Sequence, residues 1–218
     1  MKRPDLSTVR GKLKVLILVT GLLVIAGAAT TGAIVASSSP TFCASCHEMK
    51  PEFATWQVSS HKEVTCIQCH VGPGIMNLLK DKVEGIEKVA WHLSGSYTRP
   101  IEMAKPMENG QCLTCHPQEG LKNNKGELAV PHGRHLDQDV NCLSCHRGLV
   151  HGNISERGVN TAANDHLWDI AKAQEEIKPQ FSQPSMKECM VCHESRELDI
   201  GCTKCHSSFT QDFKLAPS

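Results

Sequence analysis

The cysteines and histidines of this chain follow one strict spacing. All twelve cysteines fall into six C-x-x-C pairs, and a histidine directly follows each pair. The motifs are Cys43-Cys46-His47, Cys66-Cys69-His70, Cys112-Cys115-His116, Cys142-Cys145-His146, Cys189-Cys192-His193 and Cys202-Cys205-His206. Two thiols that can form thioether bonds, followed by an imidazole that can ligate iron, are the attachment signature of c-type haem. The spacing therefore predicts six covalently attached haem c groups, each with its iron.

Zinc is the other common use of paired cysteines. A structural zinc site takes two C-x-x-C pairs and needs no regular histidine after each pair. With 12 histidines in 218 residues, six trailing histidines by chance have a probability on the order of 10⁻⁸. The haem interpretation also uses every cysteine, so none is left for a disulfide or a thiol nucleophile.

The composition predicts an unusual core. Aromatic residues make up only 4% of the chain, with a single tyrosine, whereas a chain of this length normally buries more large apolar side chains. We expect the haems to form the core of a mostly α fold with extensive loops and little β structure. Longer helices are predicted at Ile75–Leu93, before Gly95, and at about 162–178, ended by Pro179.

Residues 15–36 contain no charged side chain. As a helix they would be about 33 Å long, enough to cross a bilayer. The apolar run is longer than the core of a usual signal peptide and lacks a small-x-small cleavage site just past its end, so an uncleaved transmembrane helix is favoured over a cleaved signal. The flanking basic residues are Lys2, Arg3, Arg10, Lys12 and Lys14.

This flank predicts a single-pass protein of the cytoplasmic (inner) membrane with its N-terminus inside. The haem domain would then lie on the periplasmic or extracellular side, where haem is attached to this motif. We expect four parts: a basic tail (1–14), the membrane helix (15–36), a four-haem unit (37–153) and a two-haem extension (154–218). The formal net charge is zero, and nothing suggests a nucleic-acid partner.

Several segments together resemble one known family. The membrane helix, "FCASCHEMK", "SSHKEVTCIQCHVGPG" and "HLDQDVNCLSCHRGLVHG" are similar to the NapC/NirT family of membrane-anchored tetrahaem quinol dehydrogenases, which includes the NrfH-type subunits. The resemblance covers about residues 1–153. It does not cover the last two motifs, which the four-haem members lack.

Each iron with two histidine ligands needs a second histidine from elsewhere in the chain. The resemblance implies that His61 serves the third haem with His116, and that His151 serves the second with His70. It also implies that His135, seven residues before Cys142, serves the fourth haem with His146.

Three histidines then remain for the fifth and sixth haems, which His193 and His206 bind. Of these, His166 is placed best, in the gap between the fourth and fifth motifs. His132 stays open for either haem, and His92 is an alternative that could instead line a quinol site.

Met49 stands two residues after His47. This methionine is too near in sequence to reach the opposite face of the same haem, so it would replace His47 as the iron ligand rather than complement it. The resemblance implies the same replacement, with a sixth position that is open or blocked by a carboxylate. The alternative is a methionine that only packs on the porphyrin.

The first motif begins seven residues after Ala36, so its haem should sit at the membrane surface, where a quinol headgroup lies. Quinol oxidation releases two protons and needs a base. The resemblance implies a lysine and an acid after "HVGPG", for which Lys82 and Glu87 match best. The alternative is a solvated helix face carrying an i,i+4 ion pair between Glu84 and Lys88.

The predicted function is oxidation of menaquinol or ubiquinol and relay of the electrons to an extracytoplasmic redox protein in anaerobic respiration. One alternative is a passive electron-transfer wire fed by another membrane subunit, because resemblance of fold does not prove the site. A terminal reductase of nitrite, hydroxylamine or sulfite is less favoured, since all six motifs end in histidine and further histidines are plentiful.

Overall fold

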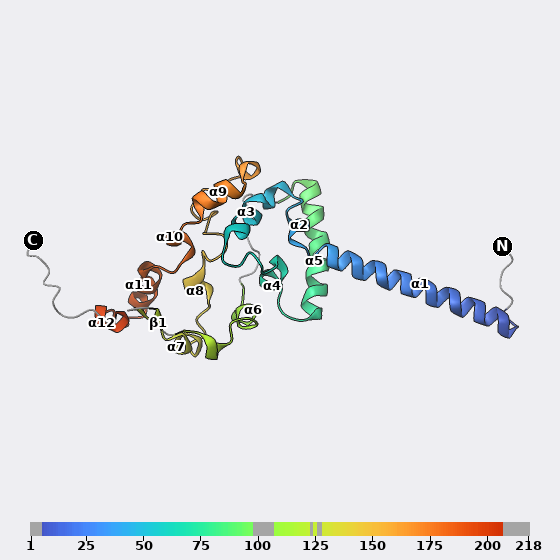
Figure 1. Cartoon of the computed structure of the whole chain (residues 1–218), viewed down its shortest axis with the longest axis horizontal. Helices are drawn as coiled ribbons and strands as arrows, with labels where there is room; N and C mark the ends of the chain where they lie inside the picture. The colour runs from blue at the N-terminus through green and yellow to red at the C-terminus, as the bar shows by residue number, and fades with distance from the viewer. Residues whose placement is uncertain (1–5, 98–106, 123, 126–127, 207–218) are drawn as a thin grey trace, which may run out of the picture. The chain divides into compact units, whose positions relative to one another are not determined.

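The computed structural model describes residues 6–97, 107–122, 124–125 and 128–206. The chain divides into two compact units, 1–45 and 46–218, which are treated separately below (Figure 1). The first unit contains α1 (Val9–Ala36) and α2 (Pro40–Cys43). The predicted class is confirmed, because the described residues are mostly helical with almost no strand.

The second unit is a series of short helices joined by loops, with one two-stranded hairpin. In chain order its elements are η1 (His47–Met49), α3 (Lys50–Val58), α4 (Cys66–His70), α5 (Ile75–Ser94), α6 (Asn109–Leu113), η2 (Gln118–Gly120), β1 (Asn124–Lys125), β2 (Leu128–Ala129), α7 (His132–Leu136), α8 (Leu143–His146), η3 (Asp165–Leu167), α9 (Ile170–Glu176), α10 (Pro179–Ser182), α11 (Met186–Ser195) and α12 (Cys202–Cys205). The strands pair antiparallel, with Asn124 opposite Ala129.

The helix α1 is long and apolar enough to cross a membrane, with a mean hydropathy of 2.2 in its most apolar window. It begins at Val9 rather than at the predicted Val15, because Thr8 caps it. The Thr8 Oγ1 accepts a hydrogen bond from Gly11 N at 3.1 Å, which satisfies one of the free N–H groups of the first turn. The 28 residues span about 42 Å.

Short helices begin at or near the cysteine pairs, and capping residues hold some of them. Gln68 Oε1 accepts from Thr65 N at 2.8 Å before α4, and Glu188 Oε2 accepts from Ser185 N at 2.8 Å before α11. Helices this short are not stable alone. The caps therefore set the local backbone, while tertiary contacts must supply the remaining stability.

The first of the two longer helices is confirmed. Helix α5 covers Ile75–Ser94 and ends where Gly95 adopts the left-handed conformation, with φ of 68°. Glycine reaches that conformation without the steric penalty of a Cβ atom, which makes it a frequent helix terminator.

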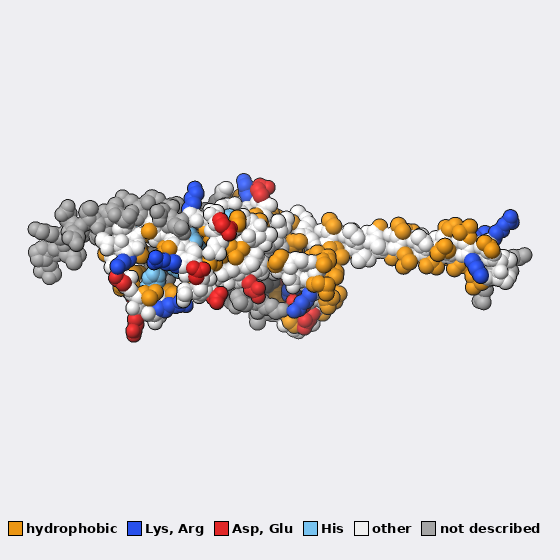
Figure 2. Space-filling model, turned by 90° about the horizontal axis from the view of Figure 1, so that it is seen from below, with side chains coloured by type: hydrophobic (Ala, Val, Ile, Leu, Met, Phe, Trp, Pro, Cys, Tyr) orange, Lys and Arg blue, Asp and Glu red, His pale blue; other side chains and the backbone are white. Residues whose placement is uncertain are grey.

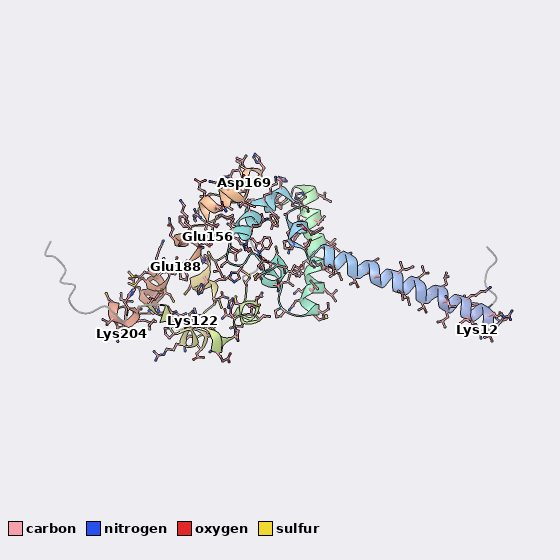
Figure 3. All side chains as sticks on the ribbon, viewed as in Figure 1. Lys12, Lys122, Glu156, Asp169, Glu188 and Lys204 are labelled. Carbon is pink, nitrogen blue, oxygen red and sulfur yellow. The ribbon has the colours of Figure 1, made fainter. Side chains whose placement is uncertain are left out.

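The second predicted helix, at about 162–178, is wrong as one continuous element. The chain forms η3, turns extended at Trp168, and starts α9 only after Asp169, whose side chain accepts from Lys172 N at 2.8 Å. Figure 3 labels this aspartate at the start of α9. The break lets Trp168 bury its ring, which is only 5% exposed. Burial of one large aromatic group thus outweighs the local helical preference.

The polypeptide core is small and centres on the packing of α3 against α9. Among the described residues, the buried apolar side chains are Ala54, Ile154, Trp168 and Ala173. So small a core agrees with the prediction that the haems supply most of the apolar interior.

One arginine ties the loop after α8 to the following helices. The Arg157 guanidinium lies 3.5 Å from the centre of the Phe181 ring, and its Nη2 pairs with Glu176 Oε2 at 2.7 Å. Its Nη1 donates to Gly152 O at 3.1 Å. The loop that carries His151 is thereby held against α9 and α10.

Candidate functional site

Four of the six motif histidines face a second histidine ring. The ring centres are 6.0 Å apart for His61–His116, 6.3 Å for His70–His151, 6.5 Å for His132–His146 and 6.2 Å for His135–His193. Two imidazoles bound on opposite sides of one metal ion, with metal–nitrogen bonds of about 2.0 Å, have ring centres roughly 6 Å apart. The described residues therefore fit an iron between the rings of each pair.

Three of these histidine rings are oriented by a hydrogen bond at their Nδ1 atom. His151 Nδ1 lies 2.9 Å from Thr55 Oγ1, His135 Nδ1 lies 3.0 Å from Pro131 O, and His61 Nδ1 lies 3.1 Å from Ser60 Oγ. Histidines that bind metal commonly use their other ring nitrogen in this way, which fixes the orientation of the ring. In each ring the Nε2 atom is left as the nitrogen for a metal.

Burial keeps several of these rings neutral. It lowers the pKa of His151 to about 4, with the nearby His70 adding to the effect. Burial is also the largest cause that lowers the pKa of His61, His70 and His146. The neutral imidazole is the form that ligates metal, so the environment favours the binding state.

The pairing differs from the sequence prediction at one haem. The structure brings together His61 with His116 and His151 with His70, the two pairings expected from sequence. The ring that faces His146, however, is His132, whereas His135 was expected there. The two candidates lie three residues apart on α7, displaced by about 4.5 Å along its axis, so each reaches a different partner.

The structure also arranges the candidates for the last two haems differently from the sequence prediction. The ring facing His193 is His135, and His132 is opposite His146. The best-placed candidate from sequence, His166, lies instead in η3, which packs against η1 and α3. Its Nδ1 is 3.7 Å from Asp165 Oδ1.

The other candidate, His92, lies near the first motif. Its Nδ1 is 3.6 Å from Glu48 Oε1, and its ring centre is 5.3 Å from that of Tyr97. Its sequence position on α5 gave no sign of this neighbour. The position agrees with the alternative in which His92 lines a quinol site.

The carboxyl group of Glu48 is the centre of this cluster, and sequence reasoning missed it. Tyr97 Oη donates to Glu48 Oε1, and His47 Nδ1 lies 3.2 Å from Glu48 Oε2. Burial works to raise the pKa of Glu48, but the Tyr97 hydrogen bond and the charges of His47 and His92 outweigh it and lower the pKa. Met49 follows at the end of η1 and is half-buried.

The two residues predicted for the quinol site lie on different sides of helix α5. Lys82 is half-buried, whereas Glu87 is exposed, and five residues place them about 140° apart around a helix. The half-buried residues of α5 are Leu78, Asp81, Lys82, Glu84 and Gly85. Asp81 is about 100° around the helix from Lys82 and Glu84 about 160°. Asp81 is therefore the half-buried acid nearer to Lys82, and the charge of Asp81 acts on His70.

An exposed apolar stripe runs along α5 beside the half-buried side. Its residues follow one another at intervals of three or four, have exposed fractions between 43% and 81%, and are Ile75, Leu79, Val83, Ile86, Val89 and Leu93. In Figure 2, hydrophobic side chains gather at the horizontal position that α5 has in Figure 1. The helix is thus strongly amphipathic, and the described residues leave its apolar side exposed.

The structure combines a helix long enough to cross a membrane with histidine rings paired at distances that fit an iron, and sequence comparison decides the family. Residues 6–156 match the N-terminal region of the NapC/NirT cytochrome c family. The chain belongs to this family. The match ends before Cys189, so the last two motifs of this NapC/NirT cytochrome lie outside it.

Two curated relatives are similar to this chain over different lengths. The cytochrome c-type protein ImcH of Geobacter sulfurreducens is 29% identical over 203 residues, which cover 82% of this chain and 39% of ImcH. The cytochrome c-type protein NrfH of Wolinella succinogenes is 29% identical over 143 residues, covering 60% of this chain and 77% of NrfH. This NapC/NirT cytochrome therefore spans well under half of ImcH.

A solved structure resembles this NapC/NirT cytochrome in fold. It is the crystal structure of the cytochrome c nitrite reductase NrfHA complex bound to the HQNO inhibitor, with a TM-score of 0.50 and 23% identity. The similarity covers 63% of this chain and 90% of the compared chain. At this identity it supports the shared fold alone.

Proposed function

We propose that this chain is a membrane-anchored hexahaem cytochrome that oxidises membrane quinol and passes the electrons to an extracytoplasmic redox protein. The observation that carries the proposal is the set of four histidine pairs, whose ring centres stand 6.0 to 6.5 Å apart, in a chain that also has a membrane-length helix. When bound, the haem irons supply reversible one-electron transfer. Histidine on both sides of an iron leaves no open position for a substrate, which supports electron transfer over a terminal reductase.

The chain would hold its haems with the six cysteine pairs, and for four of them with a pair of histidines from two regions of the chain. His61 with His116, His70 with His151 and His132 with His146 would bind the third, second and fourth irons. At the first motif we retain Met49 as the ligand in place of His47. Glu48, which lies between His47 and His92, supports this proposal because it offers the displaced imidazole a partner.

The anchor and α5 together would bring the protein to quinol. The basic flank of α1, which includes Arg10, Lys12 and Lys14, favours an N-terminus in the cytoplasm. The exposed apolar stripe of α5 has the character of a helix that lies in the membrane interface. Quinol is dissolved in the bilayer, so a site on the half-buried side that borders this stripe would be reached from the lipid.

The residues that handle the quinol would come from the half-buried side of α5. Lys82 Nζ would orient a quinol hydroxyl, and a carboxylate would accept the proton that leaves with each electron. Glu87 matches the sequence expectation, but Asp81 lies nearer to Lys82 around the helix and is the better-placed acid. The carboxylate of Glu48 is screened from water, at 3% exposure, and would hold His92 and Tyr97 in place beside the first motif.

The physiological partner is proposed only by class. The solved structure with a similar fold is a cytochrome c nitrite reductase NrfHA complex. We propose that this chain delivers electrons to a separate redox protein. Its C-terminal motifs lie outside the family match, so the surface that meets the partner is expected to differ.

The deciding experiment follows haem reduction by quinol. The full, haem-loaded chain in lipid nanodiscs is mixed with a reduced quinol analogue, and the α-band absorbance is recorded with and without HQNO. The proposal expects reduction that HQNO inhibits and that Lys82→Ala slows at least tenfold, with dithionite reduction unchanged. Arg134→Ala, an exposed residue on α7, serves as the control. Reduction by dithionite but never by quinol would favour the wire fed by another membrane subunit.

A further inference from the structure

We infer that helix α7 ligates two haem irons, the fourth through His132 and the fifth through His135, and so joins the four-haem part of the chain to its C-terminal extension. The inference rests on the haem loading in the proposed function, but it does not depend on quinol. The family match ends at residue 156, so the motif of His193 has no counterpart within it.

The ring separation of the new pair lies within the range of the other three, and its ring planes are stacked as in the His132–His146 pair. His135 and His193 have ring centres 6.2 Å apart with an angle of 25° between the ring planes. The His132–His146 pair has 6.5 Å and 17°. Both separations suit an iron held between two nitrogen atoms with bonds of about 2.0 Å. His135 is thus placed as an axial partner of His193 as well as His132 is for His146.

The His135 ring is also oriented as a metal ligand. Its Nδ1 donates to Pro131 O at 3.0 Å, while the backbone bond from His135 N to the same carbonyl is long, at 3.4 Å. The carbonyl is therefore available to the ring. This second hydrogen bond fixes the tautomer and leaves Nε2 as the nitrogen for the metal.

The two motifs that α7 would connect lie side by side. Helix α8, which ends at His146, packs against α11, which carries His193. Adjacent haems of this kind suit direct electron passage from one to the next.

A short segment, residues 128–136, touches the last three motifs. Leu128 forms an isolated antiparallel bridge with His206, and β2 packs against α12. His132 and His135 follow on the same segment and face His146 and His193. The extension is therefore fastened to the four-haem part through one continuous stretch of backbone, and α7 is the predicted exit route for electrons.

The first test counts low-spin haems in the full, haem-loaded chain. His135→Ala should keep six haems by pyridine haemochrome assay and convert one of the six from low-spin to high-spin in electron paramagnetic resonance. Added imidazole should restore the low-spin signal. Arg134→Ala, one residue earlier on the same helix and exposed, is the matched control and should change nothing. An unchanged spectrum for His135→Ala overturns the inference.

The second test assigns the affected iron. In a five-haem background, Cys189→Ala with Cys192→Ala, His135→Ala should add no high-spin haem, whereas His132→Ala should add one in both backgrounds. A further high-spin haem from His135→Ala in the five-haem chain would return His135 to the fourth haem and overturn the inference. If the five-haem chain does not assemble, a cryo-electron microscopy map of the six-haem protein decides. Nε2 of His135 on the iron of the Cys189–Cys192 haem supports the inference, and any other ligand there refutes it.

Both tests are independent of quinol oxidation. Quinol would still reduce the first haems of a His135→Ala chain, so normal quinol oxidation with altered spectra separates the two ideas. Loss of quinol oxidation with normal spectra in the parent chain would refute the quinol proposal and leave this inference intact.

Discussion

The imidazole of His151 is held from one side by the hydroxyl group of Thr55, whose Oγ1 lies 2.9 Å from its Nδ1. On its other side stands His70, at 6.3 Å between ring centres. Thr55 is fully buried, and its hydroxyl also donates to Pro51 O at 2.8 Å. Helix α3 thus orients a predicted axial ligand that comes from a distant part of the chain.

This relationship predicts the effect of Thr55→Val. Removing the hydroxyl leaves the buried Nδ1 of His151 without this partner, which costs about 1–3 kcal/mol of stability. Loss of such an outer hydrogen bond also weakens metal ligation about 10–100-fold in typical cases. We expect a lower melting temperature and a shifted midpoint potential for one haem, measured by calorimetry and redox titration. Thr55→Ser keeps the hydroxyl and should behave as the parent, and equal behaviour of both variants would contradict the prediction.

A second prediction concerns pH and the carboxyl group of Glu52. Burial raises its pKa to about 7, with a smaller contribution from Asp165, against the bond that Asn160 Nδ2 donates to Oε1 at 3.1 Å. Its Oε2 is buried with no hydrogen-bond partner among the described residues. A raised carboxyl pKa means that the folded state binds more protons than the unfolded state between about pH 4.5 and 7.

The stability that the protonated Glu52 contributes is therefore complete below about pH 4.5 and is lost as pH rises through about 7. Glu52→Gln mimics the neutral form and should remove this loss, so the variant gains on the order of 3 kcal/mol over the parent at pH 8. At pH 4.5 the two should be nearly equal. Calorimetry across this range is the measurement. The control Glu119→Gln changes an exposed carboxylate in η2, and a parallel gain there would rule out the burial explanation.

A third prediction tests Met49 as a ligand of the first iron. Replacing it with alanine should let His47 bind instead, and the two thioethers should retain the haem. Because thioether ligation raises the potential relative to imidazole, one midpoint potential should fall. Each roughly 60 mV of fall makes electron acceptance less favourable by about 1.4 kcal/mol. Redox titration and quinol-driven reduction are the measurements. Unchanged potentials and quinol rates in Met49→Ala would show that the methionine only packs there.

A fourth prediction concerns Gly148, in the loop between α8 and His151. A Cβ atom added there would lie far inside contact distance of Phe181 O, and a backbone carbonyl cannot easily move aside. Gly148→Ala should therefore destabilise the protein by about 1–3 kcal/mol and disturb the His70–His151 pair. Melting temperature and the low-spin haem count are the measurements. Gly110→Ala in α6 meets no atom within 4 Å and should leave both values near those of the parent.

Some features of this protein follow from the sequence alone, because they depend on neighbouring residues. The six C-x-x-C-H motifs follow from a covalent chemistry that requires a fixed spacing. Helix α5, with its apolar stripe and its terminal Gly95, follows from a periodicity and a stop signal that one segment contains. The apolar helix α1 can likewise be predicted without any tertiary contact.

Other features depended on tertiary structure, because they join residues that no local rule relates. The sequence predicted residues 164–169 as part of one helix, whereas in the structure the helix is interrupted where Trp168 is buried. Glu48 gained its role from His92 and Tyr97, which approach from another segment. His132 and His135 are both histidines on one turn of α7, so the sequence alone could not decide which of them faces His146. Only the packing of α8 against α11 decided that His132 faces His146 and that His135 faces His193.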